Sequence, residues 1–157
     1  MTGRERVRED ATARGIDIEF VERSAARSLA EAAAVLGLSA SSVIKTLVVK
    51  RHDGDFLFVL VPGDRQISWG KLRALVGVNK LTLPEAAVAL EATGYERGTI
   101  VPIGSTTAWP VYSDSRVAGR IALGAGEQGL SALVDADQLI AGLGATVADI
   151  TDEQSQR

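Results

Sequence analysis

Lys45 is the residue whose position first suggests chemistry. It lies within a run that otherwise has the pattern of a buried β-strand, Val43-Ile44-Lys45-Thr46-Leu47-Val48-Val49. Lysine is seldom fully buried, because its charge must be desolvated or its proton lost. Two interpretations follow: a lysine on an edge strand whose amine reaches water, or a cation that binds phosphate or carboxylate in a pocket.

A glycine- and proline-containing segment, residues 94–104, is the second candidate. Its sequence is Gly-Tyr-Glu-Arg-Gly-Thr-Ile-Val-Pro-Ile-Gly. Such residues are common in purely structural turns. The backbone N–H groups of such a loop can also bind a carbonyl oxygen or a phosphate, as in oxyanion holes. A strand lysine combined with this loop predicts an anion-binding pocket.

Asp114 is the third candidate, at the end of a short predicted strand over residues 110–114 (Pro-Val-Tyr-Ser-Asp). Its carboxylate could pair with a lysine or arginine of a site. Aspartate at such a position also commonly accepts hydrogen bonds from nearby backbone amides. Both interpretations remain open from the sequence.

Composition excludes several kinds of active site. The chain of 157 residues has no cysteine, so it has no thiol nucleophile, disulfide or thiolate metal site. Its one histidine, His52, lies beside the predicted Asp53-Gly54 turn, so neither a catalytic zinc site nor a Ser-His-Asp triad is expected. Hydrolysis here would depend on positioning, backbone hydrogen bonds and the substrate's own groups.

Composition also limits the partners. The net charge of −3 argues against a protein that coats nucleic acid, although a few placed cations suffice to bind an RNA end. The sequence contains no basic helix or helix-turn-helix pattern, so DNA binding is not expected. No run approaches the roughly 20 apolar residues of a membrane span, and no signal-peptide core follows the N-terminus. We expect a cytoplasmic protein without cofactor, metal or membrane contact.

The order of elements predicts one α+β domain over residues 1–157, with its core at about 16–150. A central mixed β-sheet is expected between flanking helices. The turn at residues 124–129 (Gly-Ala-Gly-Glu-Gln-Gly) matches a dinucleotide-binding pattern but joins two predicted strands, which argues against a Rossmann domain. Helices are predicted at 4–14, 28–37, 68–76, 84–93 and 135–143, strands at 16–20, 43–49, 56–61, 80–82, 110–114, 120–123, 130–134 and 145–150, and a frayed tail at 151–157.

The chain resembles the YbaK/EbsC family, the aminoacyl-tRNA editing (prolyl-tRNA-synthetase-associated) domain. The resemblance spans about residues 20–150 and follows the family's order of motifs. The matching stretches are 28–37 (Ser-Leu-Ala-Glu-Ala-Ala-Ala-Val-Leu-Gly), 43–48, 61–65 (Val-Pro-Gly-Asp-Arg), 93–104, 110–114 and 124–129.

The resemblance implies a free-standing deacylase that hydrolyses the ester bond of mischarged aminoacyl-tRNA without a protein nucleophile. It implies that Lys45 binds the tRNA 3′-terminal region and that the 98–104 loop holds the aminoacyl group. An aminoacyl-tRNA synthetase is a further candidate partner. The implied catalytic residues are Lys45 and Asp114, and the candidate substrate-binding residues are Thr46, Gly98, Thr99, Pro102, Gly104, Gly124 and Gly126.

Two departures from the family pattern motivate an alternative. Glu22-Arg23 stands where many members carry a histidine, and the 124–129 turn differs from the usual Ser-Gly-Gly-Arg-Arg-Gly. The alternative is a non-catalytic module of the same fold that binds a nucleotide or aminoacyl ligand.

Overall fold

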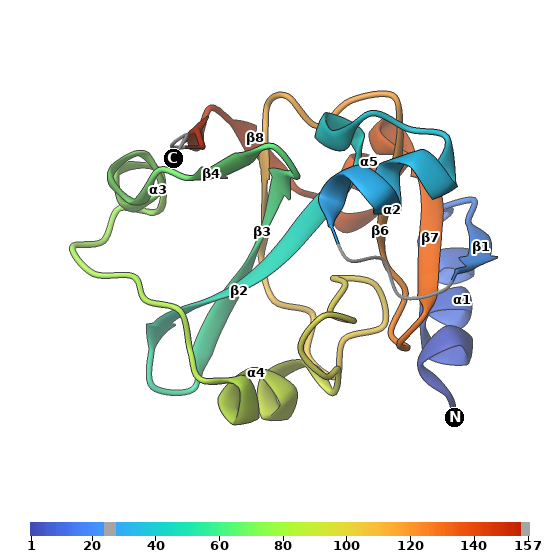
Figure 1. Ribbon diagram of the computed structural model, residues 1–157. Helices are drawn as coiled ribbons and strands as arrows, with labels where there is room; N and C mark the ends of the chain where they lie inside the picture. Colours follow the sequence, from blue (N-terminus) through green and yellow to red (C-terminus); the bar gives the residue numbers. More distant parts are fainter. Residues whose placement is uncertain (24–27, 155–157) are drawn as a thin grey trace.

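The Lys45 strand is β2 (Ile44–His52), which pairs antiparallel with β3 (Asp55–Pro62) across a tight turn at Gly54. The computed structural model of the chain describes residues 1–23 and 28–154. β3 pairs with β5 (Val111–Asp114) in parallel, and β5 pairs with β8 (Thr146–Ala148), also in parallel. The result is a four-stranded mixed sheet of order β2-β3-β5-β8 (Figure 1).

Both faces of this sheet are covered, which is why β3 is almost continuously apolar. Because side chains alternate along a strand, neighbouring residues enter different hydrophobic clusters. Leu60 packs in one cluster and Val61 in the other. We therefore call the two faces of the sheet the Leu60 face and the Val61 face. The Leu60 face also carries Ile44, Val48 and Phe58, and the Val61 face carries Leu47, Val49 and Val59.

A second, antiparallel sheet stands beside the first. Its strands are β1 (Glu19–Glu22), β7 (Leu130–Asp135) and β6 (Arg120–Gly124), in the order β1-β7-β6. An isolated bridge between Val43 and Ala122 connects the start of β2 to β6. A short ribbon of β4 (Arg65–Ile67) and β9 (Thr151–Glu153) lies beyond the end of β3.

Five helices are seen in the described residues, and their ends follow the capping residues of the sequence. They are α1 (Gly3–Ala13), α2 (Leu29–Leu36), α3 (Trp69–Val76), α4 (Ala86–Thr93) and α5 (Ala136–Leu143). The sequence Ser28-Leu29-Ala30-Glu31 predicts a capping box, and the Ser28 hydroxyl accepts the expected hydrogen bond from the Glu31 amide at 3.1 Å. None of these helices is both long and apolar enough to cross a membrane.

The α+β class and mixed sheet are confirmed, but three local predictions are wrong. The apolar runs at 43–49 and 56–61 predict two central strands, but β2 is an edge strand of the four-stranded sheet, because only isolated bridges lie on its other side. The predicted strand at 80–82 is reduced to one bridge between Lys50 and Thr82. In the predicted frayed tail, Thr151–Glu153 forms β9 by pairing with β4, which the sequence pattern did not predict; residues 155–157 lie outside the described part.

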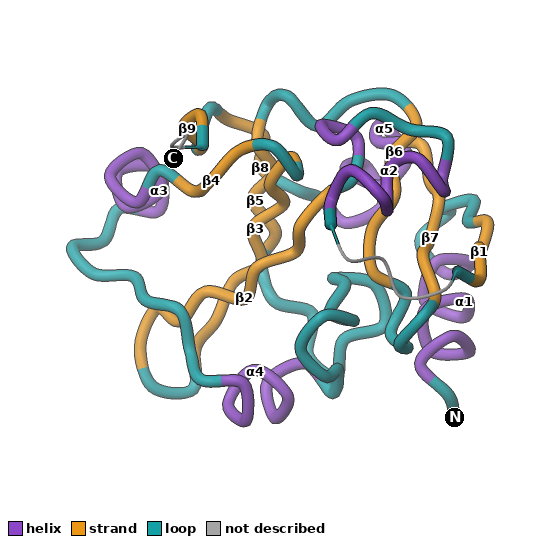
Figure 2. Tube along the Cα trace, in the orientation of Figure 1, coloured by secondary structure: helices purple, strands orange, loops and turns teal. Residues whose placement is uncertain are grey.

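Helix α1 holds the glycine-rich segment 94–104 in place. The Arg6 guanidinium donates hydrogen bonds to the carbonyls of Thr93, Gly94 and Gly104 at 3.2, 3.2 and 2.7 Å. Asp10 accepts a hydrogen bond from the Gly104 amide at 2.7 Å. Both ends of the segment are therefore tied to one helix, although Figure 2 shows the connection from α4 to β5 as a long loop.

Replacing Arg6 with alanine should lower the free energy of unfolding by about 2–3 kcal/mol, because several carbonyls lose a charged donor. The matched control is Arg8→Ala on the same helix, whose guanidinium only lies 5.1 Å from the Phe20 ring centroid. That change should cost about 0.5–1 kcal/mol. Urea unfolding measures both values. Equal losses would contradict the tie between α1 and the loop.

Candidate functional site

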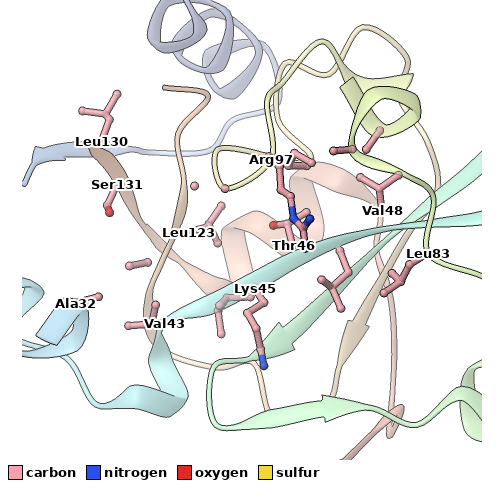
Figure 3. Close-up of a pocket in the computed structure, with 18 of the residues that line it drawn as sticks. Ala32, Val43, Lys45, Thr46, Val48, Leu83, Arg97, Leu123, Leu130 and Ser131 are labelled. Atoms are coloured by element: carbon pink, nitrogen blue, oxygen red, sulfur yellow. The ribbon is translucent and has the colours of Figure 1, made fainter. Parts of the chain in front are cut away.

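A cavity of about 520 Å³ opens on the Leu60 face of β2. Its walls come from α2, α4, β6, β7 and the 94–104 segment, so it is built from parts far apart in the sequence (Figure 3). A cavity of this volume suits a small ligand or the end of a larger one. The apolar part of the lining includes Ala32, Ile44, Val48, Ala89, Ile100 and Leu123.

Thr46 places a hydroxyl group at this cavity. It lies opposite Leu60 in the β2–β3 pairing and therefore shares the Leu60 face. Its Oγ1 atom is buried and has no hydrogen-bond partner in the described part of the chain. An unpaired buried hydroxyl costs free energy, so it is a group that a bound ligand could satisfy.

Lys45 borders the same cavity, but its ammonium group leaves it. The residue is paired with Val61, on the opposite face of the strand from Thr46. Its Nζ donates a hydrogen bond to the Arg65 carbonyl at 2.6 Å, and Figure 3 shows the side chain pointing away from Thr46. Burial lowers the pKa of Lys45, and the nearby Asp64 carboxylate partly offsets this by raising it. The cation is thus partly desolvated and bound to one neutral acceptor.

Only part of the predicted glycine-rich loop reaches the cavity. Gly98 and Ile100 line it, and neither backbone amide donates a hydrogen bond to any acceptor within residues 1–23 and 28–154. The Gly104 amide is already bound to Asp10. Thr99 is buried with its hydroxyl on the Glu96 carbonyl, and Pro102 lines a separate, smaller cavity. Gly98 and Ile100 are therefore the residues of this loop that line the cavity with an amide that has no described acceptor.

The glycines of the 124–129 turn allow close backbone contacts. Gly124 lines the cavity, and a Cβ atom there would lie 2.8 Å from the Ile100 carbonyl oxygen. Gly126 is absent from the lining; its amide donates to the Thr99 carbonyl at 3.0 Å, and its φ is +83°. Both glycines let the β6–β7 turn approach the 94–104 segment, which fixes that wall of the cavity.

The structure does not place Asp114 in the lining of the cavity, and its predicted catalytic role stays a prediction. Its side chain is fully buried at the end of β5 and does not line the cavity. Its oxygens accept hydrogen bonds from the Ile150 amide at 3.1 Å and from Arg116 at 3.2 Å. These contacts match the other interpretation of Asp114, that it satisfies backbone amides and pairs with an arginine.

Four polar residues of the cavity were not predicted as site residues. Arg23 donates from Nε to the Ser131 hydroxyl at 2.8 Å, and both line the cavity. Glu85 adds a carboxylate at the rim. Arg97 lines the cavity as well, and its position within the glycine-rich segment was a signal that could have identified it. In the described residues, no group of acidic or histidine side chains could hold a metal ion.

The fold and this cavity define the class of protein. The sequence profile of the aminoacyl-tRNA editing domain matches residues 23–141, and the chain belongs to that family. α1, with Arg6 and Asp10, lies before the matched region.

Individual relatives agree with this class. A solved structure described as a candidate trans-editing enzyme for prolyl tRNA synthetase has 27% identity and a TM-score of 0.86, covering 97% of this chain and 98% of its own. The proline–tRNA ligase of Thermosipho africanus is 35% identical over 88 residues, and that of Desulfovibrio desulfuricans is 33% identical over 102 residues. These matches take in 56% and 65% of this chain but only 16% and 17% of the ligases' lengths.

If Asp114 is structural, Asp114→Ala should lower the free energy of unfolding by about 2–4 kcal/mol, because the buried Ile150 amide and Arg116 lose their acceptor. Asp114→Asn keeps one acceptor oxygen and should lose less. The turnover rate per folded molecule should be unchanged in Asp114→Asn. A stable, folded Asp114→Asn protein without activity would instead support the predicted catalytic role.

Tyr95, at the start of the loop, should make the protein less stable at high pH. Burial raises the pKa of this phenol from 10.0 to about 12, and its hydroxyl donates to the Ile103 carbonyl at 2.8 Å. A raised folded-state pKa means that its stabilising effect is complete below pH 10 and is lost as the pH rises toward 12. Urea unfolding at several pH values should show this decline, and Tyr95→Phe should reduce its slope. An identical slope in the variant would contradict the assignment.

Proposed function

We propose that this protein is a free-standing deacylase that hydrolyses the ester bond of mischarged aminoacyl-tRNA. The observation that carries the proposal is the cavity on the Leu60 face of β2, within an editing-domain fold. It combines an apolar lining with unpaired hydrogen-bond donors at Thr46, Gly98 and Ile100. An aminoacyl ester has matching parts: a side chain for the apolar wall and a carbonyl oxygen for the donors.

The proposed substrate position follows from the burial of the apolar lining residues, of which Ala89 and Leu123 are almost fully buried. The aminoacyl group lies against Ala89, Ile100 and Leu123, and the terminal adenosine occupies the wider opening. The start of the glycine-rich loop holds the ester carbonyl through the Gly98 and Ile100 amides. The attacking group is a water molecule or a ribose hydroxyl, since the chain has no cysteine and His52 does not line the cavity. When water attacks, the bond from the ester carbon to the ribose oxygen breaks, that oxygen takes a proton and the free amino acid departs. When a ribose hydroxyl attacks, the acyl group first moves to that hydroxyl, and water then hydrolyses the new ester.

Lys45 is proposed to contact the tRNA 3′-terminal region from the edge of the cavity. Its partly desolvated ammonium is bound to a single backbone carbonyl, that of Arg65. A phosphate group is a stronger partner for that cation than a neutral carbonyl. Binding of the RNA end would then exchange the Arg65 carbonyl for a phosphate oxygen, and a prolyl-tRNA synthetase is the partner that the relatives suggest.

The test is deacylation of a panel of mischarged tRNAs by the wild type and by Lys45→Ala. Loss of a charge-assisted contact of about 1.5–3 kcal/mol should lower kcat/KM about 10- to 100-fold. Lys50→Ala is the matched control, because this lysine is on the same strand but pairs with Asp53 on the surface. It should retain the wild-type rate.

Two outcomes decide between the proposal and its alternative. Multiple-turnover hydrolysis of at least one mischarged tRNA establishes the deacylase. Thermal stabilisation by an aminoacyl-adenosine analogue without hydrolysis of any tRNA identifies a non-catalytic binding module instead. The second outcome is motivated by the turn at residues 124–129, which differs from the usual sequence of the family.

A further inference from the structure

We propose that Arg97 is a catalytic residue of this site, whose guanidinium stabilises the negative charge that develops on the ester carbonyl oxygen. This inference rests on the proposed deacylase function and assigns the cationic role in the cavity to a residue other than Lys45. Arg97 belongs to the turn between α4 and the glycine-rich loop, directly before Gly98.

The directions of the side chains support this assignment. Arg97 lines the cavity, and in Figure 3 its side chain runs from the loop toward Thr46. The Lys45 ammonium points the opposite way and is bound to the Arg65 carbonyl. Arg23, the other arginine of the lining, is fixed by its hydrogen bond to Ser131 on β7.

The groups around Arg97 are donors that lack acceptors. Its guanidinium makes no ion pair or hydrogen bond with any described residue. The Thr46 hydroxyl is unpaired, and the Gly98 and Ile100 amides have no acceptor within the described part of the chain. Donors without a described acceptor on β2 and on the loop thus belong to residues that line one cavity. An oxygen that gains negative charge during the reaction is the ligand that satisfies them.

The reaction proceeds by addition and elimination at the ester carbon. The oxygen of a water molecule forms a bond to the ester carbon and gives up a proton to solvent, while the carbonyl π electrons move to oxygen, which becomes an oxyanion. Arg97 and Thr46 donate hydrogen bonds to that oxyanion. The oxyanion then re-forms the carbonyl, the bond to the esterified ribose oxygen breaks, and that oxygen takes a proton from solvent. Arg97 keeps its own proton throughout.

Arg97 is exposed in the free protein, and this suits the role. A substrate that fills the cavity covers the guanidinium and removes water from it, which strengthens the interaction at the moment of reaction. Because the side chain is exposed and makes no ion pair or hydrogen bond with a described residue, its replacement should leave the fold intact.

The experiment compares the wild type, Arg97→Ala and Arg97→Met with a mischarged tRNA that the wild type deacylates. Removal of one oxyanion donor should lower kcat about 10²-fold, with KM changed less than about 3-fold. Added guanidinium ion, at concentrations far below those that unfold the protein, should restore part of the rate in Arg97→Ala. The control is Arg51→Ala, an exposed arginine of β2 outside the cavity, which should keep its rate and show no rescue.

The outcomes are separable from those of the proposed function. If the wild type deacylates no tRNA in the panel, the proposed function fails first. If the wild type is active and Arg97→Met keeps its kcat, Arg97 is not catalytic and the inference is overturned. A rise in KM with unchanged kcat would also overturn it, since it would assign Arg97 to ground-state binding.

Discussion

The alternation of side chains along β2 is the constraint on which the site depends. Pairing with β3 fixes the register, so Lys45 faces the same side as Val61 and Thr46 the same side as Leu60. Lys45 and Thr46 both line the cavity, but their polar groups point to opposite sides of the strand. The hydroxyl faces the Leu60 side, and the ammonium is bound to the Arg65 carbonyl at the start of β4.

The rest of the site is a loop held from both ends. Arg6 and Asp10 of α1 fasten Gly104, while the Gly126 amide fastens the Thr99 carbonyl. The Gly104 amide and the Thr99 carbonyl are thereby used within the protein. The Gly98 and Ile100 amides, which belong to residues of the cavity lining, have no acceptor in the described part of the chain. A loop held in this way can be rigid and still offer donors to a ligand.

Much of the fold could be predicted from local signals, such as the capping box at Ser28 and the turn at Gly54. Pairings between distant segments could not, because nothing in Thr151–Glu153 itself indicates that β4 lies beside it. The Lys45 region was identified correctly as lining a cavity, but periodicity does not reveal which face of a strand is hollow. Asp114 was ambiguous for a similar reason: its partner Ile150 is distant in the sequence.

The central claim is that the aminoacyl end of the substrate lies on the Leu60 side of β2. An amide-linked aminoacyl-adenosine, which cannot be hydrolysed, tests this directly by NMR titration of the backbone amides. We predict the largest shifts at Gly98, Ile100 and Ser131, around the cavity. Shifts confined to the Arg65 and Thr151 side of the sheet, with none at Gly98 or Ser131, would contradict the account.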